Sequence, residues 1–319
     1  MPDGVIDLAL VGVGPMAAQH VDALRDVGGL RVVSCVSRTK EKADAFARDH
    51  GIAEGRTYEQ LIRRPQADAL WISVSASAMA PVAHELNALQ LPMFLEKPVG
   101  LSVEESRAAR DFITVPHMVG LNRRYYEIIA QGLDLIRQHG GVRGIEVHMP
   151  EDVRPHIERI GERMARQWQF ANSIHLIDLF RFCGGEVGDV LINNTVKGVD
   201  DRSYNALLRF ESGATGVYHA QWYAPGGWRL AIYAAEISIV FQPIEQAVVS
   251  KRGQAPFQLA TTGPDSRHKP GLHGQAQAFA NYVAGASRDT SAADLADYVR
   301  SVELVHALTM ECGFGVQTS

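Results

Sequence analysis

Short apolar runs alternate with helical patterns through residues 1–120. Ile6 to Val11 and Leu30 to Val36 are compact apolar stretches, as expected of strands that are buried on both faces. Further strands are predicted over 67–74, 92–95 and 116–119, and helices over 18–27, 40–50 and 78–89. Strands that alternate with helices of about ten residues predict a parallel, doubly wound α/β sheet of the Rossmann type.

The pattern changes after Gly120-Leu121-Asn122. Strand-like runs then follow one another across short turns, which predicts a large, mostly antiparallel open sheet. Strands are predicted over 142–149, 190–199, 203–210, 216–222 and 228–241, and helices over 126–138, 173–183, 275–284 and 293–311, with an irregular segment over 150–168. We therefore expect a dinucleotide-binding domain over 1–121 and an α+β domain for substrate binding and oligomerisation over 122–319.

A glycine-rich turn joins the first predicted strand to the first helix. Gly12, Gly14 and Ala17 form a G-x-G-x-x-A element, with Pro15 and Met16 inside it. The first glycine permits a tight turn, the second lets a pyrophosphate approach the backbone, and the small alanine allows close packing of helix on strand. The element predicts binding of a dinucleotide; a glycine-rich turn without a ligand is the alternative.

The second strand ends in Ser37-Arg38-Thr39, at the place where NAD sites usually carry an acidic residue for the ribose. Arg38 is suited to a 2′-phosphate, with Ser37 and Thr39 as additional donors, so NADP(H) is favoured over NAD(H). A solvated surface arginine is the alternative. Ser75 and Ser77 follow the third predicted strand and are further candidates for cofactor binding.

The apolar run before Glu96-Lys97-Pro98 predicts a buried strand that ends in two charges. In open α/β sheets ligands bind at the carboxyl ends of the strands, so Glu96 and Lys97 are candidates for the cofactor site. The proline biases Lys97 toward an extended backbone. Ser102 and Glu105 have the spacing of a capping box and predict the start of a helix. A solvated ion pair at a strand-to-helix turn is the alternative interpretation.

Composition narrows the class of protein. With 319 residues, 46% of them hydrophobic, and a net charge of −5, the chain can form two cores and gives no reason to expect a nucleic acid or membrane partner. No apolar run reaches the ~18 residues of a membrane span, and Met1-Pro2-Asp3-Gly4 lacks the basic n-region of a secretion signal, so we expect neither. Cys35, Cys183 and Cys312 favour reduced thiols and a cytoplasmic protein. No metal site is predicted.

The glycine-rich turn, Glu96-Lys97-Pro98 and His175-x-x-Asp178 together resemble the Gfo/Idh/MocA oxidoreductases, the glucose–fructose oxidoreductase and inositol dehydrogenase family, over nearly the whole chain. The resemblance implies NAD(P) in the first domain and a sugar, cyclitol or related alcohol at the mouth between domains. It implies that Lys97 touches the reacting oxygen and that His175 is the acid or base beside it. It also implies a cis Lys97-Pro98 bond, and a homodimer or homotetramer built on the second domain's sheet.

Two departures from the family pattern affect the chemistry. Ala171 stands where relatives carry an acidic residue four positions before the histidine, and the loop after the third strand has become Ser75-Ala76-Ser77. We therefore expect Lys97 to carry more of the proton chemistry than in typical relatives. Asp178, on the same helix face as His175, is suited either to orient the histidine or to anchor a neighbouring loop.

Several polar and aromatic residues are candidates for the substrate pocket, and each also fits a packing or surface role. These candidates are Arg124, Tyr125, Trp168, Asn172, His175 and His273, with Arg163 and Gln275 at lower rank. The expected activity is NAD(P)-dependent hydride transfer at a hydroxyl or keto carbon of a sugar, cyclitol or sugar-derived intermediate. The alternatives are a glycosidase that retains its nicotinamide and works by transient oxidation, and a nonenzymatic sensor of a dinucleotide or other ligand.

Overall fold

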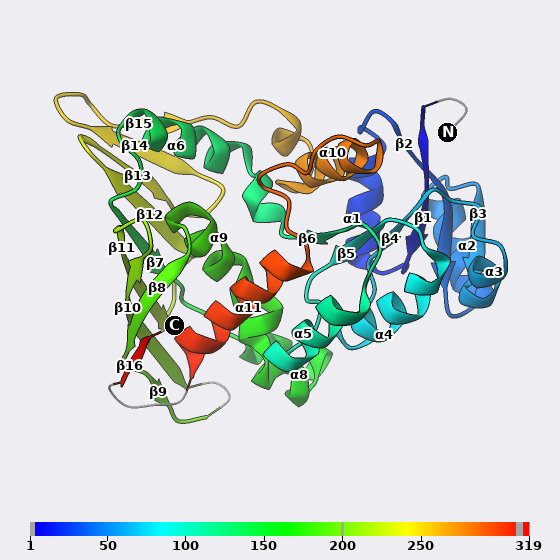
Figure 1. Ribbon diagram of the computed structural model, residues 1–319, viewed down its shortest axis with the longest axis horizontal. Coiled ribbons are helices and arrows are strands. Elements are labelled where there is room, and N and C mark those ends of the chain that lie inside the picture. Colours follow the sequence, from blue (N-terminus) through cyan, green and yellow to red (C-terminus); the bar gives the residue numbers. More distant parts are fainter. Residues whose placement is uncertain (1–3, 199–200, 311–314, 319) are drawn as a thin grey trace. The chain divides into compact units, whose positions relative to one another are not determined.

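The computed structural model describes residues 4–198, 201–310 and 315–318. The chain forms two compact units, Met1–Tyr125 with Gly263–Val299 (unit 1) and Tyr126–Thr262 with Arg300–Ser319 (unit 2). The chain therefore crosses from one unit to the other more than once (Figure 1).

Unit 1 is built on a six-stranded parallel sheet in the order β3-β2-β1-β4-β5-β6. Its strands are β1 (Ile6–Val11), β2 (Leu30–Ser37), β3 (Glu54–Thr57), β4 (Ala69–Ile72), β5 (Met93–Glu96) and β6 (His117–Gly120). This is the order of the doubly wound dinucleotide-binding fold, and it confirms the predicted class of the first domain. All four residues of β4 and of β5 are buried, which explains their uninterrupted apolar sequence.

Helices cover this sheet, and two of them begin at a residue whose side chain caps the helix. They are α1 (Pro15–Leu24), α2 (Lys40–Asp49), α3 (Tyr58–Arg63), α4 (Ala76–Leu86), α5 (Val103–Phe112) and α10 (Leu272–Val283), with short turns η1 (Asn87–Leu89), η2 (Asn122–Tyr125) and η5 (Pro264–Ser266). Ser102 caps α5 as predicted, since its hydroxyl accepts from the Glu105 amide at 3.2 Å. The Glu105 carboxylate accepts from the amide of Leu101, so only half of the expected capping box forms there.

The segment 263–299, which the sequence analysis placed in the second domain, groups with unit 1. Its helix α10 packs on α1 and buries Phe279 against Trp71 and Phe94 in the unit's core. Ala293 also forms a β-bridge with Val119 of β6. The helical periodicity of 275–284 shows only that one face is buried, and nothing local indicates against which sheet it packs.

Unit 2 contains a mostly antiparallel sheet in the order β15-β14-β13-β12-β7-β11-β10-β8-β16, with β9 paired to β10. Its strands are β7 (Gly144–His148), β8 (Val187–Ile192), β9 (Thr195–Val196), β10 (Arg202–Phe210), β11 (Thr215–Gln221), β12 (Arg229–Ala234), β13 (Ile237–Phe241), β14 (Ala247–Lys251), β15 (Phe257–Leu259) and β16 (Gly315–Thr318). The pairing confirms the predicted open sheet. One pair, β7 with β11, is parallel.

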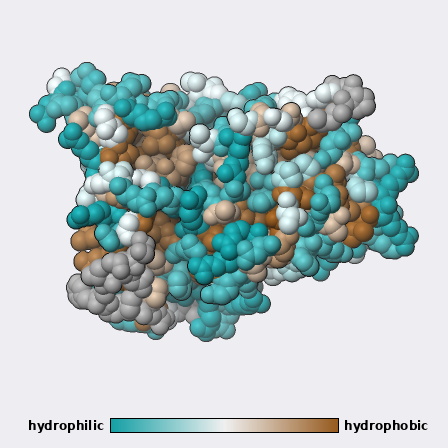
Figure 2. All heavy atoms as spheres, in the orientation of Figure 1, coloured by the Kyte–Doolittle hydropathy of each residue, from teal (hydrophilic) through white to brown (hydrophobic). Residues whose placement is uncertain are grey.

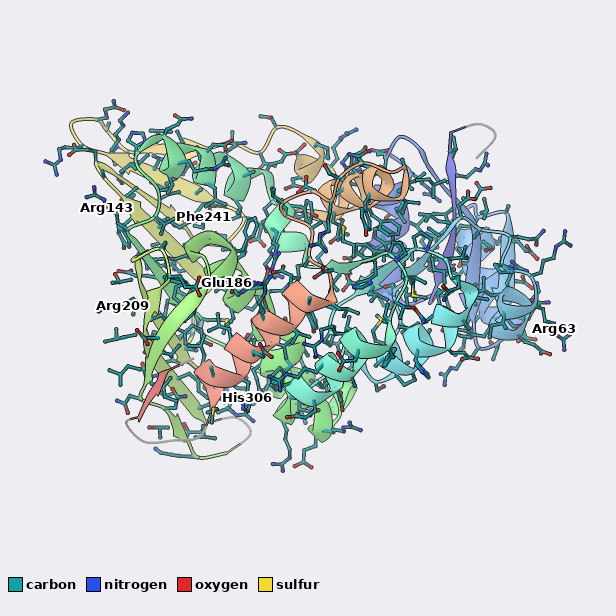
Figure 3. The ribbon with its side chains drawn as sticks, viewed as in Figure 1. Arg63, Arg143, Glu186, Arg209, Phe241 and His306 are labelled. Atoms are coloured by element: carbon teal, nitrogen blue, oxygen red, sulfur yellow. The ribbon has the colours of Figure 1, made fainter. Side chains whose placement is uncertain are left out.

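Helices pack on one face of this sheet and leave the other open. The helical elements of unit 2 are α6 (Glu127–Gln138), η3 (Arg154–His156), α7 (Ile157–Ile160), α8 (Glu162–Arg166), the π-turn η4 (Gln169–Ser173), α9 (Ile174–Gly184) and most of α11 (Leu295–Thr309). Gly132 of α6 lies against Phe241 of β13, whereas Arg209 of β10 points away on the open face (Figure 3).

The open face carries exposed apolar side chains. Leu191, Leu207 and Val217 are 37%, 57% and 43% exposed on the neighbouring strands β8, β10 and β11. They line a shallow hollow of about 400 Å³. Hydrophobic residues reach the surface over this sheet at the left of Figure 2. Elsewhere, no helix in the described part of the chain combines the length and apolar composition that crossing a membrane requires.

Candidate active site

The glycine-rich turn has the geometry that a pyrophosphate requires. Gly12 has φ +108°, and a Cβ there would lie 2.1 Å from the carbonyl oxygen of Ser73, so only glycine fits. Gly14 precedes α1, and a Cβ placed on it would meet nothing within 4 Å, which leaves open space before the helix. Ala17 is fully buried against the sheet. The residues therefore fit a dinucleotide whose pyrophosphate meets the N-terminus of α1.

The end of β2 offers donors and no carboxylate. Ser37 is buried, whereas Arg38 and Thr39 are exposed before α2. The guanidinium of Arg38 lies close enough to Tyr58 to oppose the rise that burial produces in the pKa of that phenol. On the next loop, the Ser75 and Ser77 hydroxyls lie 3.5 Å apart at the start of α4.

Lys97 follows β5 and is joined to Pro98 by a cis peptide bond, as the resemblance predicted. Burial lowers the pKa of Lys97 to about 8. The neighbouring Glu96 opposes this shift, and the cations Arg123 and Lys269 reinforce it. An amine with this pKa exchanges a proton near neutral pH, which an ordinary lysine does not.

Glu96 is held by a residue that sequence analysis did not select. The Nε2 atom of His20 lies 3.0 Å from Oε1 of Glu96, and both residues are buried. The imidazole packs edge-on against Trp71 and Phe94. A buried histidine of the core therefore fixes the position of the Glu96 carboxylate, which is adjacent to Lys97 in the sequence.

A second cation approaches the glycine-rich turn from the segment before α10. The Nζ atom of Lys269 lies 3.5 Å from Sδ of Met16, and burial lowers its pKa. Asn122 holds this segment in place by donating to the carbonyl of Pro270 at 3.0 Å. Positive charge therefore gathers where the phosphates of a dinucleotide are expected.

Three residues of unit 1 that were predicted to bind substrate make polar contacts with other residues of the same unit. Arg124 is buried and pairs with Asp297 at 2.6 Å. The hydroxyl of Tyr125 contacts Met118 within the core. His273 lies 3.3 Å from the carbonyl of Asp26, beyond the C-terminal end of α1. The ten residues of α1 span about 15 Å, so His273 is near the opposite end of that helix from the glycine-rich turn.

In unit 2, α9 carries His175 and Asp178, which are 7% and 1% exposed. Asp178 accepts a hydrogen bond of 2.6 Å from the Ser301 hydroxyl of α11, and Arg181 donates to the same hydroxyl. Asp178 therefore ties α9 to helix α11, whereas the anchoring role expected from the sequence was toward a loop. Of the lower-ranked candidates, Arg163 is exposed on α8, and Gln275 of unit 1 is completely buried.

The donors of Trp168 and Asn172, two predicted substrate residues, converge on a buried carboxylate of unit 2. Trp168 donates its indole N–H to Glu151 at 2.9 Å, and the Asn172 amide donates to both carboxylate oxygens at 3.2 and 3.3 Å. Ser173 donates its hydroxyl at 2.9 Å. The structure thus brings these residues together around Glu151.

Family models match both units. The model described as "Oxidoreductase family, NAD-binding Rossmann fold" matches residues 6–113, and the Gfo/Idh/MocA C-terminal domain matches residues 137–240. Together they cover most of the chain in the expected order.

The chain belongs to the Gfo/Idh/MocA oxidoreductase family.

Two dehydrogenases are similar in sequence to this chain. An inositol 2-dehydrogenase from Rhizobium meliloti (strain 1021) is 23% identical over 282 residues, which cover 84% of this chain and 82% of that protein. A D-apiose dehydrogenase from Paraburkholderia graminis is 25% identical and matches 66% of this chain and 58% of its own length.

Solved structures show the same fold. A dehydrogenase from Chromobacterium violaceum superposes with a TM-score of 0.82 at 17% identity, covering 96% of this chain and 94% of the other. A levoglucosan dehydrogenase in complex with NADH gives a TM-score of 0.76 at 21% identity, with 95% of each chain covered.

His20, Glu151 and Lys269 are polar residues of this Gfo/Idh/MocA chain that sequence reasoning missed. His20 falls on the same face of α1 as the buried residues Ala17 and Leu24, and a polar residue on a buried face was a usable signal. Glu151 lies three residues after β7, a strand in which buried and partly exposed residues alternate, and no local signal distinguished it. Within the described residues, no three His, Cys, Asp or Glu side chains gather as a metal site would require.

Proposed function

We propose that this Gfo/Idh/MocA protein is an NADP-preferring dehydrogenase or reductase that acts on a sugar, a cyclitol or a sugar-derived intermediate. The observation that carries the proposal is Lys97, whose amine has a pKa of about 8 at the carboxyl end of β5, next to the edge strand β6 of the dinucleotide-binding sheet. Binding a dinucleotide requires no such amine, whereas a buried amine that titrates near neutral pH is suited to the proton chemistry of a hydroxyl. The names of the inositol, D-apiose and levoglucosan dehydrogenases support the substrate class.

The reaction separates a hydride from a proton. A nicotinamide held by the glycine-rich turn and the end of β2 would supply the acceptor or donor of the hydride at the carbon that bears the reacting oxygen. The hydroxyl proton leaves as the C=O bond forms. We propose that Lys97 forms a hydrogen bond to the reacting oxygen, and that His175 exchanges the proton of that oxygen. A positioned acid–base group of this kind contributes ~10²–10⁴ in rate.

The preference for NADP(H) rests on Ser37, Arg38 and Thr39. Arg38 is exposed at the end of β2, where a guanidinium meets a 2′-phosphate, and this strand end supplies no carboxylate for a 2′-hydroxyl. We also assign cofactor contacts to Gly12, Gly14, Pro15, Met16, Ala17, Ser75, Ser77, Glu96 and Lys97.

We further propose a homodimer or homotetramer built on the open face of the unit 2 sheet. The exposed side chains of Leu191, Leu207 and Val217 support this assignment, because a contiguous apolar patch favours contact with a second copy. Cys35 and Cys183 are buried thiols, which supports a cytoplasmic location; Cys312 lies outside the described residues.

The test is the stoichiometry of nicotinamide turnover. Purified protein is mixed with NADP⁺ or NAD⁺ and with inositol, D-apiose or levoglucosan in turn, and in reverse with the oxidised products and NADPH or NADH. The proposal predicts one nicotinamide reduced or oxidised for each substrate consumed. Hydrolysis of a glycoside without net nicotinamide change would establish the glycosidase instead, and binding without chemistry would establish the sensor.

A further inference from the structure

The carboxylate of Glu151 gathers donors from a single short segment. It accepts from Trp168, Asn172 and Ser173 at the distances given above. Glu151 is only 6% exposed. Burying a carboxylate costs several kcal/mol unless hydrogen bonds compensate. Three side-chain donors supply this compensation, and they join the end of β7 to the segment before α9.

The backbone of Glu151 is itself tied to the sheet. Its amide donates to the carbonyl of Gln221 at 3.3 Å, and its carbonyl accepts from the amide of Tyr223 at 2.7 Å. Glu151 also forms a parallel β-bridge with Trp222. The carboxylate is therefore presented from a fixed point at the ends of β7 and β11, two inner strands of the unit 2 sheet.

The segment that Glu151 holds determines where His175 points. Gln169–Ser173 is a π-turn that continues directly into α9, with Ser173 in a helical conformation. A π-turn inserts one extra residue, which turns every later side chain by about 100° around the helix axis compared with an unbroken α-helix. His175 is the second residue of α9, so its direction depends on whether the π-turn is kept.

We infer that Glu151 is a positioning residue for His175: its carboxylate holds the π-turn that sets the direction of the imidazole. The inference rests on the role proposed for His175 and adds a requirement to it. His175, the second residue after the π-turn, should lose its orientation in Glu151→Gln, because the three donors share the two carboxylate oxygens and the amide replaces one of these acceptors with a donor.

The first test compares two variants that make the same chemical change near opposite ends of α9. Glu151→Gln removes the carboxylate at the π-turn. Glu186→Gln removes the carboxylate that pairs with Arg181 at 3.0 Å near the C-terminal end of the helix (Figure 3). We expect Glu151→Gln to lower kcat by about 10- to 100-fold, the scale of a misplaced catalytic group, with KM for the nicotinamide unchanged. Glu186→Gln should leave kcat unchanged.

A double-mutant cycle separates positioning from general destabilisation. If Glu151 acts through His175, Glu151→Gln should have little further effect on kcat in a His175→Ala background. A full additional loss in that background would overturn the inference and leave the proposed activity intact. A His175→Ala enzyme with normal kcat would overturn both the inference and the role proposed for His175.

Hydrogen exchange provides a readout that needs no substrate. Amides over 169–175 should exchange faster in Glu151→Gln than in Glu186→Gln, and Ser173→Ala, which removes one donor, should give a smaller change in the same direction. The Ser173 variant also serves if Glu151→Gln fails to fold. Unchanged exchange over 169–175 in the folded variants would overturn the inference.

Discussion

The Nε2 atom of His20 lies 3.0 Å from Oε1 of Glu96 and joins helix α1 to the end of strand β5 inside unit 1. Glu96 is the residue before Lys97, and its charge opposes the effect of burial on the pKa of the lysine. The pair therefore connects the core of the dinucleotide-binding unit to the charge of the proposed catalytic amine.

His20→Leu should destabilise the protein, because it leaves the buried Glu96 carboxylate without this partner. The expected loss is about 1–3 kcal/mol in the free energy of unfolding, measured by urea denaturation. His306→Leu is the matched control, since His306 is exposed on α11 (Figure 3). Equal unfolding midpoints for the two variants would contradict the structural role of the pair.

Lys97→Met should raise the Tm at about pH 7, although it removes a proposed catalytic group. The folded-state pKa of about 8 lies below the ordinary value of 10.5, so the folded protein resists protonation of this amine. Below the folded pKa this cost is fully present. Between about 8 and 10.5 the unfolded state binds more protons, and wild-type stability rises with pH.

The Tm difference between Lys97→Met and wild type should therefore shrink as the pH rises through that window. Differential scanning fluorimetry of both proteins across the range measures it. A lower Tm for the variant at about pH 7 would show that the ammonium is stabilising in the folded state, and the assigned pKa shift would be wrong.

Arg38→Ala should weaken NADP(H) binding selectively, by about 1–3 kcal/mol if the contact is a charge-assisted hydrogen bond. Calorimetry with NADP(H) and NAD(H) measures the two affinities. Arg63→Ala is the control, because Arg63 is an exposed arginine of the same unit on α3 (Figure 3). Equal or tighter binding of NAD(H) by the wild-type protein would remove the argument from Arg38.

Leu207→Lys should dissociate the proposed oligomer. Leu207 is 57% exposed at the centre of the apolar patch, and an ammonium there would be buried against the second copy. Ile62→Lys places the same charge on an exposed apolar position of unit 1 and should leave the oligomer intact. Light scattering decides between these outcomes, and a monomeric wild-type protein at micromolar concentration would refute the assembly.

Sequence alone predicted the elements whose signals are local. The strand-loop-helix of Gly12 to Ala17 and the apolar run before Lys97 carry their roles in adjacent residues, and the structure contains both as expected. The open sheet was also predictable from consecutive apolar runs, although β3, β14, β15 and β16 were missed, and the run over 228–241, predicted as one strand, forms the two strands β12 and β13.

The remaining features depend on contacts between distant parts of the chain. Glu96 meets His20 across 76 positions, and Glu151 meets Ser173 across 22. The return of 263–299 to unit 1 is equally non-local, since only the assembled core shows where Phe279 packs. Spacing rules cover neighbours on one helix or strand, so none of these pairings was predictable from periodicity.

The central claim is that Lys97 acts on the reacting oxygen of a hydride transfer. Steady-state turnover of Lys97→Met, His175→Ala and the wild-type protein, with the substrate identified from the panel above, tests it most directly. The account predicts that Lys97→Met lowers turnover by ~10²–10⁴ while NADP(H) affinity stays nearly intact, and that His175→Ala costs less. Near-normal turnover in Lys97→Met would contradict the mechanism, and a larger loss at His175 would reverse the two roles.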